Sequence, residues 1–353
     1  MTDLLVAGAG MAGLAAAAQG RARGASVEIY EKGDRCGGSM LLSSGVIWRH
    51  RDFDRFREEC PTGDPLLQRT IFDRLDGDLA WLEALGATVI ERDTGNPATA
   101  GVRFDTRALT DALVAAAGAK VRLDEPLEAL PDRGPVVLAT GGFQADRELV
   151  RRHVTPEADS LLLRATPWST GDGLRLGLDA GARTTKRMDE FYGRNMPAPP
   201  ARIAERDFVP LAQLYATHAN VTNQDGEEFY TSRWSEIDAV QWTARQPGAR
   251  AWYTVWNMDL GRRVRERTVG EMIEAAERAG APVRRDEEQV TVEVVAAITT
   301  TLGGLRIDEH AQVAPGLFAC GTDAGGIATG GYSSGLAAAL VFGRIAADAA
   351  LGF

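Results

Sequence analysis

Cysteine is scarce in this sequence, and long uncharged apolar runs are missing. Only three cysteines occur among 353 residues, and no two of them form a C-x-x-C pair. We therefore expect neither a disulfide framework nor a metal site, and we predict a reducing, cytoplasmic location. No apolar run reaches 18 uncharged residues, so no membrane span is expected. The first residues lack a basic segment, which argues against a signal peptide.

Positive charge is also in deficit. The formal net charge is −10, which argues against nucleic acid or an anionic membrane surface as a partner. The length suits one large or two ordinary domains, and the 44% of hydrophobic residues is an ordinary globular value. These figures leave an enzyme acting on a small molecule as an open class.

What is present begins with a strand, a glycine-rich turn and a helix. The apolar run 4–7 leads into three glycines spaced G-x-G-x-x-G, and an alanine-rich helix is expected over 11–23. The first glycine, Gly8, permits a tight turn, Gly10 lets the backbone approach a pyrophosphate, and Gly13 allows helix and strand to pack closely. The helix N-terminus offers unpaired N–H groups to phosphates.

An acidic residue completes this pattern. A second strand is expected over 26–30 and ends at Glu31, 18 positions after Gly13. A carboxylate there can accept hydrogen bonds from a ribose 2′-hydroxyl and disfavours a 2′-phosphate. The pattern predicts a dinucleotide-binding βαβ unit, with NAD and FAD both open at this point. A glycine-rich turn in an ordinary α/β domain is the alternative.

Three further glycine-rich elements follow, at 37–45, 140–142 and 321–335. A nicotinamide dehydrogenase usually needs only the first element, whereas an extended FAD needs several along its length. The last element precedes an apolar helix expected over 336–350, whose N-terminus could stabilise negative charge on a reduced flavin. These elements favour FAD as the cofactor.

The order of expected elements indicates an α/β fold. Strands are expected over 120–123, 135–139 and 317–320, and helices over 65–86 and 109–117. From residue 186 prolines and aromatic residues become frequent, which indicates an inserted domain. We predict a Rossmann-like FAD-binding domain, a parallel sheet with helices, interrupted by a smaller α+β substrate cap domain. The predicted boundaries are 1–185 and 297–353 for the FAD-binding domain and 186–296 for the cap.

Several motifs carry a family resemblance: Val136-Val137-Leu138-Ala139-Thr140-Gly141-Gly142-Phe143, Thr170-Gly171-Asp172-Gly173, Val221-Thr222-Asn223-Gln224-Asp225-Gly226, Thr301-Leu302-Gly303-Gly304-Leu305 and Phe342-Gly343-Arg344-Ile345-Ala346. With them the chain resembles the FAD-dependent fumarate reductase and 3-ketosteroid dehydrogenase superfamily over nearly its full length. The segment Ser43-Ser44-Gly45-Val46-Ile47-Trp48 looks like the ketosteroid branch in particular. The resemblance implies hydride transfer between flavin N5 and a substrate carbon next to an activated carbon.

The resemblance and the first motif together predict the cofactor-binding residues: Gly8, Gly10, Met11, Ala12, Gly13, Glu31, Lys32, Gly38, Ser39, Ser43, Ser44, Gly45, Thr140, Gly141, Gly142, Asp172, Gly321, Asp323, Ser334, Gly335 and Leu336. Asp323 matches the acid that holds the ribityl chain in relatives, although Gly-Thr-Asp departs from the commoner Gly-Glu. Gly335 and Leu336 match positions at the pyrimidine edge of the flavin.

Two departures bear on the substrate. Fumarate reductases share an arginine within the last glycine loop, but residues 329–335 of this chain contain no arginine. They also carry a histidine before Thr-x-Gly-Gly, where this chain has Thr299-Thr300-Thr301. A carboxylate clamp is therefore missing where it is expected, which disfavours fumarate or succinate. The loop instead resembles the ketosteroid branch, whose hydroxyls contact a substrate carbonyl, and the cap is short for the superfamily.

Four residues are candidates for catalysis. Tyr332 and Ser334 could polarise a substrate carbonyl, or they could pack in the loop and cap the following helix. Tyr192 could act as a base, and Arg194 could donate a proton or bind a carboxylate; alternatively, they could be a core tyrosine and a surface arginine. Weaker candidates, for which an ordinary structural role is favoured, are His218, Arg233 and Arg262.

These inferences predict an FAD-dependent oxidoreductase that desaturates or reduces a small organic molecule at a carbon α or β to a carbonyl. The alternatives are a flavin-dependent amine or hydroxyl oxidase and a non-catalytic flavin-binding subunit of a complex. The predicted partners are a small-molecule substrate and an electron donor or acceptor of unknown identity. A homodimer is the expected assembly.

Overall fold

The computed structural model describes residues 2–132, 134–231 and 235–353, which form two compact units. The first unit comprises Met1–Asp146, Thr166–Glu190 and Thr300–Phe353, and the second comprises Arg147–Ala165 and Phe191–Thr299. The chain therefore passes between the units at 190/191 and 299/300, a few residues beyond the predicted boundaries at 185/186 and 296/297. Residues 147–165 also join the second unit, which the sequence analysis did not anticipate.

A six-stranded sheet forms the centre of the first unit. Its strands lie in the order β16 (Gln312–Ala314), β17 (Leu317–Ala319), β7 (Val136–Leu138), β1 (Leu4–Ala7), β2 (Val27–Tyr30) and β6 (Lys120–Arg122). All neighbouring pairs are parallel except β16 and β17. Strand β1 has β2 on one side and β7 on the other, so the order of connection reverses at β1, where α/β sheets bind their ligands.

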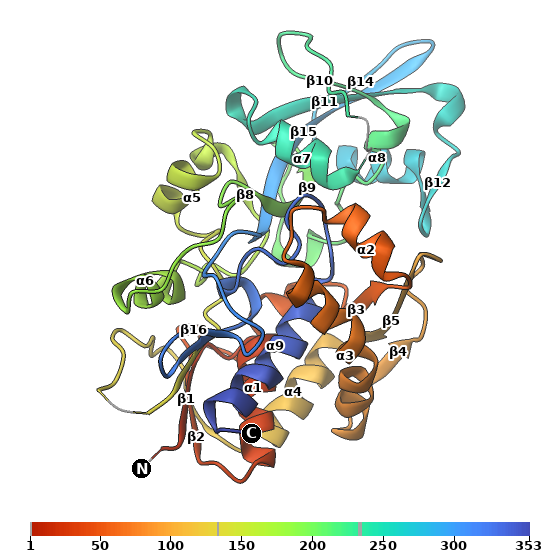
Figure 1. Ribbon diagram of the computed structural model, residues 1–353. Coiled ribbons are helices and arrows are strands. Elements are labelled where there is room, and N and C mark those ends of the chain that lie inside the picture. The colour runs from red at the N-terminus through yellow and green to blue at the C-terminus, as the bar shows by residue number, and fades with distance from the viewer. Residues whose placement is uncertain (1, 133, 232–234) are drawn as a thin grey trace. The chain divides into compact units, whose positions relative to one another are not determined.

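Three helices pack side by side in the first unit: α1 (Met11–Ala22), α4 (Thr106–Ala117) and α9 (Gly335–Ala350) (Figure 1). Helix α1 is buried along most of its length, and four consecutive alanines make up its centre. Small residues let α1 and α9 approach closely, and a Cβ on Gly343 would collide with the Ala12 carbonyl. This approach explains the glycine of the Phe-Gly-Arg motif in α9.

A second, antiparallel sheet of the first unit was not predicted. It has the order β3 (Val46–His50), β5 (Thr99–Phe104), β4 (Val89–Glu91), and it contacts α3 (Pro65–Ala84). Helix α2 (Phe53–Glu59) follows β3 directly and contacts α3. The strands are short, and β3 lies far in sequence from its partner β5, so the register of this pair is a long-range property that local periodicity did not reveal.

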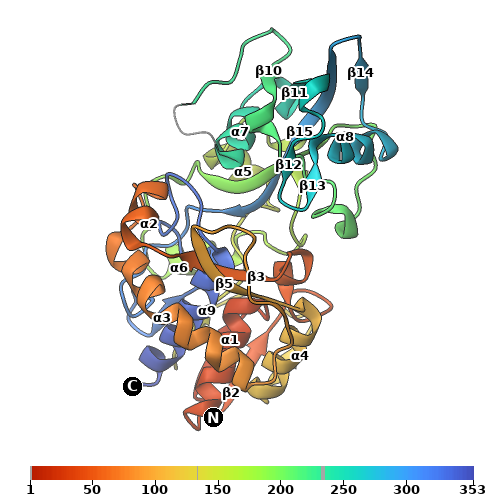
Figure 2. The same ribbon diagram turned by 90° about the vertical axis from the view of Figure 1, so that its right-hand side faces the viewer.

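The second unit is built on the long strand β15 (Gln289–Thr301). Its sheet has the order β10 (Asn220–Thr222), β11 (Arg250–Trp256), β15, β14 (Val283–Arg285), and two further strands, β8 (Leu162–Leu163) and β9 (Phe191–Pro197), also pair with β15. Helices α7 (Glu236–Thr243) and α8 (Val269–Arg278) share a hydrophobic core with this sheet (Figure 2).

Strand β8 explains why residues 147–165 belong to the second unit. It extends β15 by parallel pairing, and the Thr155 hydroxyl donates to the Ala244 carbonyl at 2.8 Å. The remaining short elements of the two units are α5 (Arg147–His153), α6 (Asp172–Asp179), β12 (Arg263–Val264), β13 (Arg267–Thr268), η1 (Gly38–Leu42), η2 (Ala158–Ser160), η3 (Glu205–Asp207), η4 (Ala216–His218), η5 (Pro247–Ala249), η6 (Asn257–Asp259) and η7 (Gly321–Asp323). In the described residues no helix is long and apolar enough to cross a membrane.

Candidate flavin and substrate site

The turn between β1 and α1 has the geometry of a phosphate site. A Cβ on Gly8, whose φ is +106°, would collide with the Ala139 carbonyl, and a Cβ on Gly13 would collide with the Gly8 carbonyl. Gly10 differs, because a Cβ there would meet only the Gly38 Cα, at 4.0 Å. Gly8 and Gly13 thus serve packing, whereas Gly10 keeps open the N-terminus of α1, which has no side-chain cap. An anion fits this opening.

Glu31 is buried at the end of β2, beside this turn. Its carboxylate accepts the Ala9 N–H at 2.6 Å and the Gly33 N–H at 2.7 Å, one on each oxygen. A carboxylate offers about four acceptor positions, so two remain for ribose hydroxyls. The backbone bonds orient the group next to the phosphate turn, which fits the predicted ribose contact.

The second and third glycine elements lie against the first. The Gly37 N–H donates to the Ala9 carbonyl at 2.8 Å, and a Cβ on Gly38 would lie 3.2 Å from the Gly10 Cα. Farther along the chain, the Ser39 hydroxyl accepts the Thr166 N–H at 3.2 Å. Lys32 donates to the Asp172 carboxylate at 2.9 Å, which joins two predicted cofactor residues to each other. Met11 and Ala12 bury their side chains, so only their backbones can face a phosphate.

Two predicted flavin contacts have structural roles within their own turn. The Ser43 hydroxyl donates to the Met40 carbonyl at 2.8 Å and accepts the Gly45 N–H at 3.1 Å. Gly45 has a φ of +73°, and a Cβ there would collide with the Phe104 carbonyl. Ser44 is exposed. Local bonding therefore accounts for Ser43 and Gly45 without a ligand.

Asp323 joins the third and fourth glycine elements. Its buried carboxylate accepts the Thr140 N–H at 2.5 Å, the Gly142 N–H at 3.0 Å and the Thr140 hydroxyl at 3.1 Å. Burial raises the pKa of Asp323, and these bonds oppose the rise. Three protein donors occupy the group that we predicted to hold a ribityl chain. These bonds make Asp323 a clamp on the Thr-Gly-Gly loop, and its contact with the ribityl chain stays a prediction.

The last glycine loop leads into α9. Ser334 is the N-cap of this helix, and its hydroxyl accepts the Ala337 N–H at 3.3 Å. This bond supports the capping alternative for Ser334, and its catalytic role stays a prediction. Gly335 is exposed, and a Cβ there would meet no atom within 4 Å, whereas Gly321 in η7 lies against Ala12. The N-terminus of α9 is thus open, as a ligand beside Gly335 and Leu336 would require.

Tyr332 is only partly buried, and its ring packs edge-on against Trp48 of β3, with 5.7 Å between centroids. Sequence reasoning missed His50, two residues farther along the same strand face. Its ring lies 5.2 Å from both the Trp48 and Phe56 rings, and neither ring nitrogen makes a hydrogen bond of ordinary geometry. Burial lowers the pKa of His50 despite the nearby Tyr332 carbonyl and Glu59. The signal available in the sequence was its spacing of two residues from Trp48, which places both side chains on one face of a strand.

The other catalytic candidates belong to the second unit. Tyr192 and Arg194 lie on one face of β9, and the Arg194 guanidinium lies 5.1 Å from the centre of the Tyr192 ring. Arg194 is 7% exposed, so the surface-arginine alternative was wrong. Its positive charge affects the ionisation of Glu236 in α7. Burial raises the pKa of Glu236 to about 7, and the charge of Arg194 opposes this rise. His218 lies in η4, Arg262 is exposed, and Arg233 falls outside the described residues.

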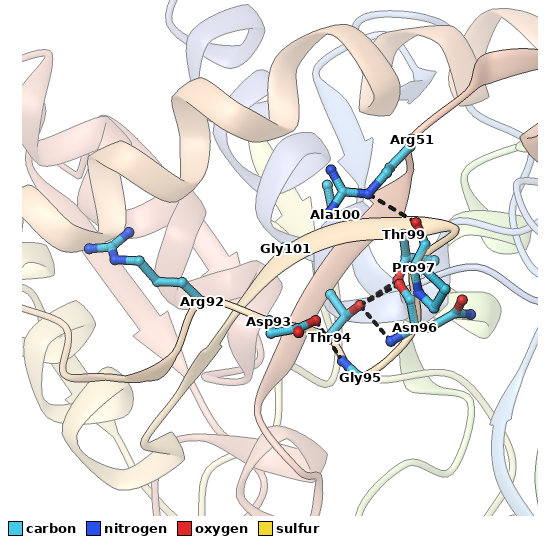
Figure 3. Close-up of a pocket in the computed structure, with 10 residues that line it drawn as sticks. All are labelled: Arg51, Arg92, Asp93, Thr94, Gly95, Asn96, Pro97, Thr99, Ala100 and Gly101. Atoms are coloured by element: carbon cyan, nitrogen blue, oxygen red, sulfur yellow. Dashed lines mark hydrogen bonds between the residues drawn. The ribbon is translucent and has the colours of Figure 1, made fainter. Parts of the chain in front are cut away.

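A cavity of about 460 Å³ lies at the β4–β5 connection (Figure 3). None of the predicted site residues lines it. Arg51 donates to the Pro97 carbonyl at 3.0 Å, and Arg92 pairs with Glu83 at 2.7 Å and points away from the turn. Both arginines that line the cavity bond to other groups of the protein, so we do not assign the cavity to the cofactor. Residues 2–132, 134–231 and 235–353 hold no group of three or more His, Cys, Asp or Glu arranged for a metal.

Comparison with known proteins matches two family models to consecutive parts of the chain. Residues 48–336 match the FAD binding domain family, and residues 6–47 match the NAD(P)-binding Rossmann-like domain. A probable fumarate reductase from Shewanella frigidimarina (strain NCIMB 400) is 24% identical, over 98% of this chain and 74% of the relative.

Two solved structures share the fold. The open conformation of a flavocytochrome c3 fumarate reductase has a TM-score of 0.74 and 22% identity, over 99% of this chain and 78% of that one. The 3-ketosteroid delta1-dehydrogenase from Sterolibacterium denitrificans also has a TM-score of 0.74, with 16% identity over 99% of both chains. The predicted superfamily and Rossmann-like fold are thus confirmed, and members of both branches share it. The chain belongs to the FAD binding domain family, which confirms FAD as its cofactor and an FAD-dependent oxidoreductase as its enzyme class.

Proposed function

We propose that the protein desaturates or reduces a carbon–carbon bond α,β to the carbonyl of a small neutral substrate. The proposal rests on the position of Tyr332. Its partly exposed ring packs against Trp48. Tyr332 also lies three residues before the open N-terminus of α9. Bound FAD supplies a hydride donor or acceptor at N5. The Tyr332 hydroxyl would donate a hydrogen bond to the substrate carbonyl, which acidifies the neighbouring C–H.

The residue types of two segments support a neutral substrate over a dicarboxylate. Residues 329–335 contain no arginine, and threonines occupy 299–301. A carboxylate held without a bidentate guanidinium would lose its strongest available hydrogen bonds. The similar proteins include fumarate reductases and a 3-ketosteroid dehydrogenase. We place this chain's substrate with the carbonyl compounds.

Proton transfer is assigned to Tyr192 and Arg194 as a proposal. The buried Arg194 lies within electrostatic reach of Glu236, whose pKa of about 7 lets it exchange protons near neutrality. Tyr192 is partly exposed beside Arg194 and could accept the substrate proton.

An anaerobic screen of flavin bleaching tests the substrate class. Saturated ketones should bleach the oxidised-flavin band of the holoenzyme. Conjugated enones should restore the band of the chemically reduced holoenzyme. Dicarboxylates serve as the competing class, and response to them alone would contradict the proposal. Rapid release of peroxide from amines or alcohols would instead support an oxidase.

Tyr332→Phe tests the role of the hydroxyl. We expect the variant to retain FAD and to slow flavin reduction by substrate about 10²- to 10³-fold, the usual cost of one donor to a developing oxyanion. Stopped-flow absorbance measures this rate. Tyr230→Phe, a change at a tyrosine that is 84% exposed, is the matched control and should leave the rate unchanged. Equal rates in Tyr332→Phe and the wild type would remove Tyr332 from the mechanism.

A further inference from the structure

The loop that carries Tyr332 is held by a buried carboxylate. Glu190 is 3% exposed, and its Oε2 accepts the Gly330 N–H at 2.7 Å. Its other oxygen pairs with the Arg187 guanidinium. An ionised acceptor makes a stronger hydrogen bond to an amide than a neutral one does. Gly330 lies two residues before Tyr332 and four before the helix cap Ser334, so this bond acts on the backbone that leads to both.

The loop is also packed closely against residues 59–61. A Cβ on Gly331 would collide with the Glu59 carbonyl, and a Cβ on Gly330 would lie 2.9 Å from Pro61 Cδ. The backbone at 330–331 is therefore in contact with residues 59–61 and is bonded to Glu190. Two such restraints leave the loop little freedom to shift, because protein interiors are close-packed.

Glu190 also lies where the chain leaves the first unit, and it bonds the segment by which the chain returns. It is the last residue of the first unit before residue 191 begins β9. Its carbonyl accepts the Leu302 N–H at 2.9 Å, two residues after the chain returns to the first unit at Thr300. One residue thus bonds the loop by its side chain and the returning strand by its backbone.

We propose that Glu190 is a positioning residue: its carboxylate sets the position of Gly330 and, through it, that of Tyr332 and the N-terminus of α9. The functional consequence rests on the proposed role of Tyr332, whereas the restraint on the loop does not. Without the acceptor the Gly330 N–H is left unsatisfied, and the loop samples positions in which Tyr332 is misplaced.

Two variants of similar size separate the acceptor from packing. Glu190→Met fills similar space without a strong acceptor, and Glu190→Gln keeps a carbonyl oxygen at the same distance along the side chain. Hydrogen–deuterium exchange of the holoenzyme, read by mass spectrometry, reports on the amides of residues 329–334. We expect at least about tenfold faster exchange in Glu190→Met, because local opening no longer breaks this bond, and near wild-type exchange in Glu190→Gln.

Arg187→Met is the matched control, since it removes the ion pair and leaves the Gly330 bond in place. Its exchange at 329–334 should stay at the wild-type value. Wild-type exchange in Glu190→Met would overturn the proposal, as would equal acceleration in Glu190→Met and Glu190→Gln. If exchange behaves as expected but flavin reduction is unchanged, the restraint stands and the catalytic role of Tyr332 falls.

Discussion

Glu236 is a carboxylate whose protonation is governed by opposing influences. It lies in the first turn of α7, where a helix N-terminus favours negative charge, and its Oε1 accepts the Ala216 N–H at 3.0 Å. Arg194 and Arg265 also lower its pKa. Burial outweighs all three and raises the pKa from 4.5 to about 7. The residue thus changes charge near neutral pH in a part of the molecule to which we assign proton transfer.

This shift predicts a pH dependence of stability. The folded protein binds the Glu236 proton more tightly than the unfolded chain, so the contribution is full below pH 4.5 and is lost as pH rises to about 7. A shift of this size corresponds to at most about 3 kcal/mol. Glu236→Gln should remove this loss, so its free energy of unfolding relative to the wild type should rise between pH 5 and 8 in urea titrations.

Gln keeps an acceptor for the Ala216 N–H, so the comparison isolates the charge. Glu274→Gln, at an exposed site on α8, is the control and should give a difference that does not vary with pH. A Glu236→Gln difference that is also constant between pH 5 and 8 would contradict the raised pKa.

At the scale of elements, the β1–α1 turn shows how three glycines divide two tasks. Gly8 and Gly13 let the turn pack against β7 and against itself, whereas Gly10 faces open space at the N-terminus of α1. Gly10 has a φ of −78°, which alanine adopts without strain. Packing and ligand approach can therefore be separated by substitution.

Gly10→Ala should leave the stability of the apoprotein within about 0.5 kcal/mol of the wild type and weaken FAD binding at least about tenfold. Gly13→Ala should lower stability by about 1–3 kcal/mol, because its Cβ collides with the Gly8 carbonyl. Thermal unfolding and quenching of FAD fluorescence measure the two effects. Wild-type FAD affinity in Gly10→Ala would exclude a phosphate at this turn.

At the scale of the molecule, a buried polar network joins three helices of the first unit. Arg344 of α9 pairs with Asp78 of α3, and its Nε donates to Gln19 of α1 at 3.0 Å. Gln19 in turn donates to Asp348 at 2.8 Å. Asp78 is 2% exposed, and burial raises its pKa although Arg344 and Arg74 oppose the rise. The network holds α9, whose N-terminus belongs to the candidate site.

Asp78→Leu should lower the free energy of unfolding by about 3 kcal/mol, because the half-buried Arg344 guanidinium loses its carboxylate partner. The double variant Asp78→Leu/Arg344→Leu should recover much of this loss, since an apolar pair can replace a buried ion pair. Urea unfolding in a double-mutant cycle measures the coupling. Additive effects of the two substitutions would show that the pair contributes no coupling.

The spacing of residues along the sequence was sufficient to predict several elements of this fold. The turn at Gly8–Gly13, the strand that ends at Glu31 and the helices that begin near 106 and 335 were predicted within a few residues. Each depends on neighbours in sequence: a φ that only glycine adopts readily, a helical period, or an acid at the end of a strand. The sequence by itself therefore determined the dinucleotide fold and, with the family motifs, FAD.

Tertiary structure alone decided how the individual polar residues are used. Asp323 clamps Thr140 across 183 positions, and Glu190 holds Gly330 across 140. The burial of Arg194 and the membership of 147–165 in the second unit likewise follow from tertiary context. Hydrogen-bond partners and burial arise when distant segments meet, and no local period records them. Whether a hydroxyl or carboxylate serves structure or chemistry is therefore decided by the fold.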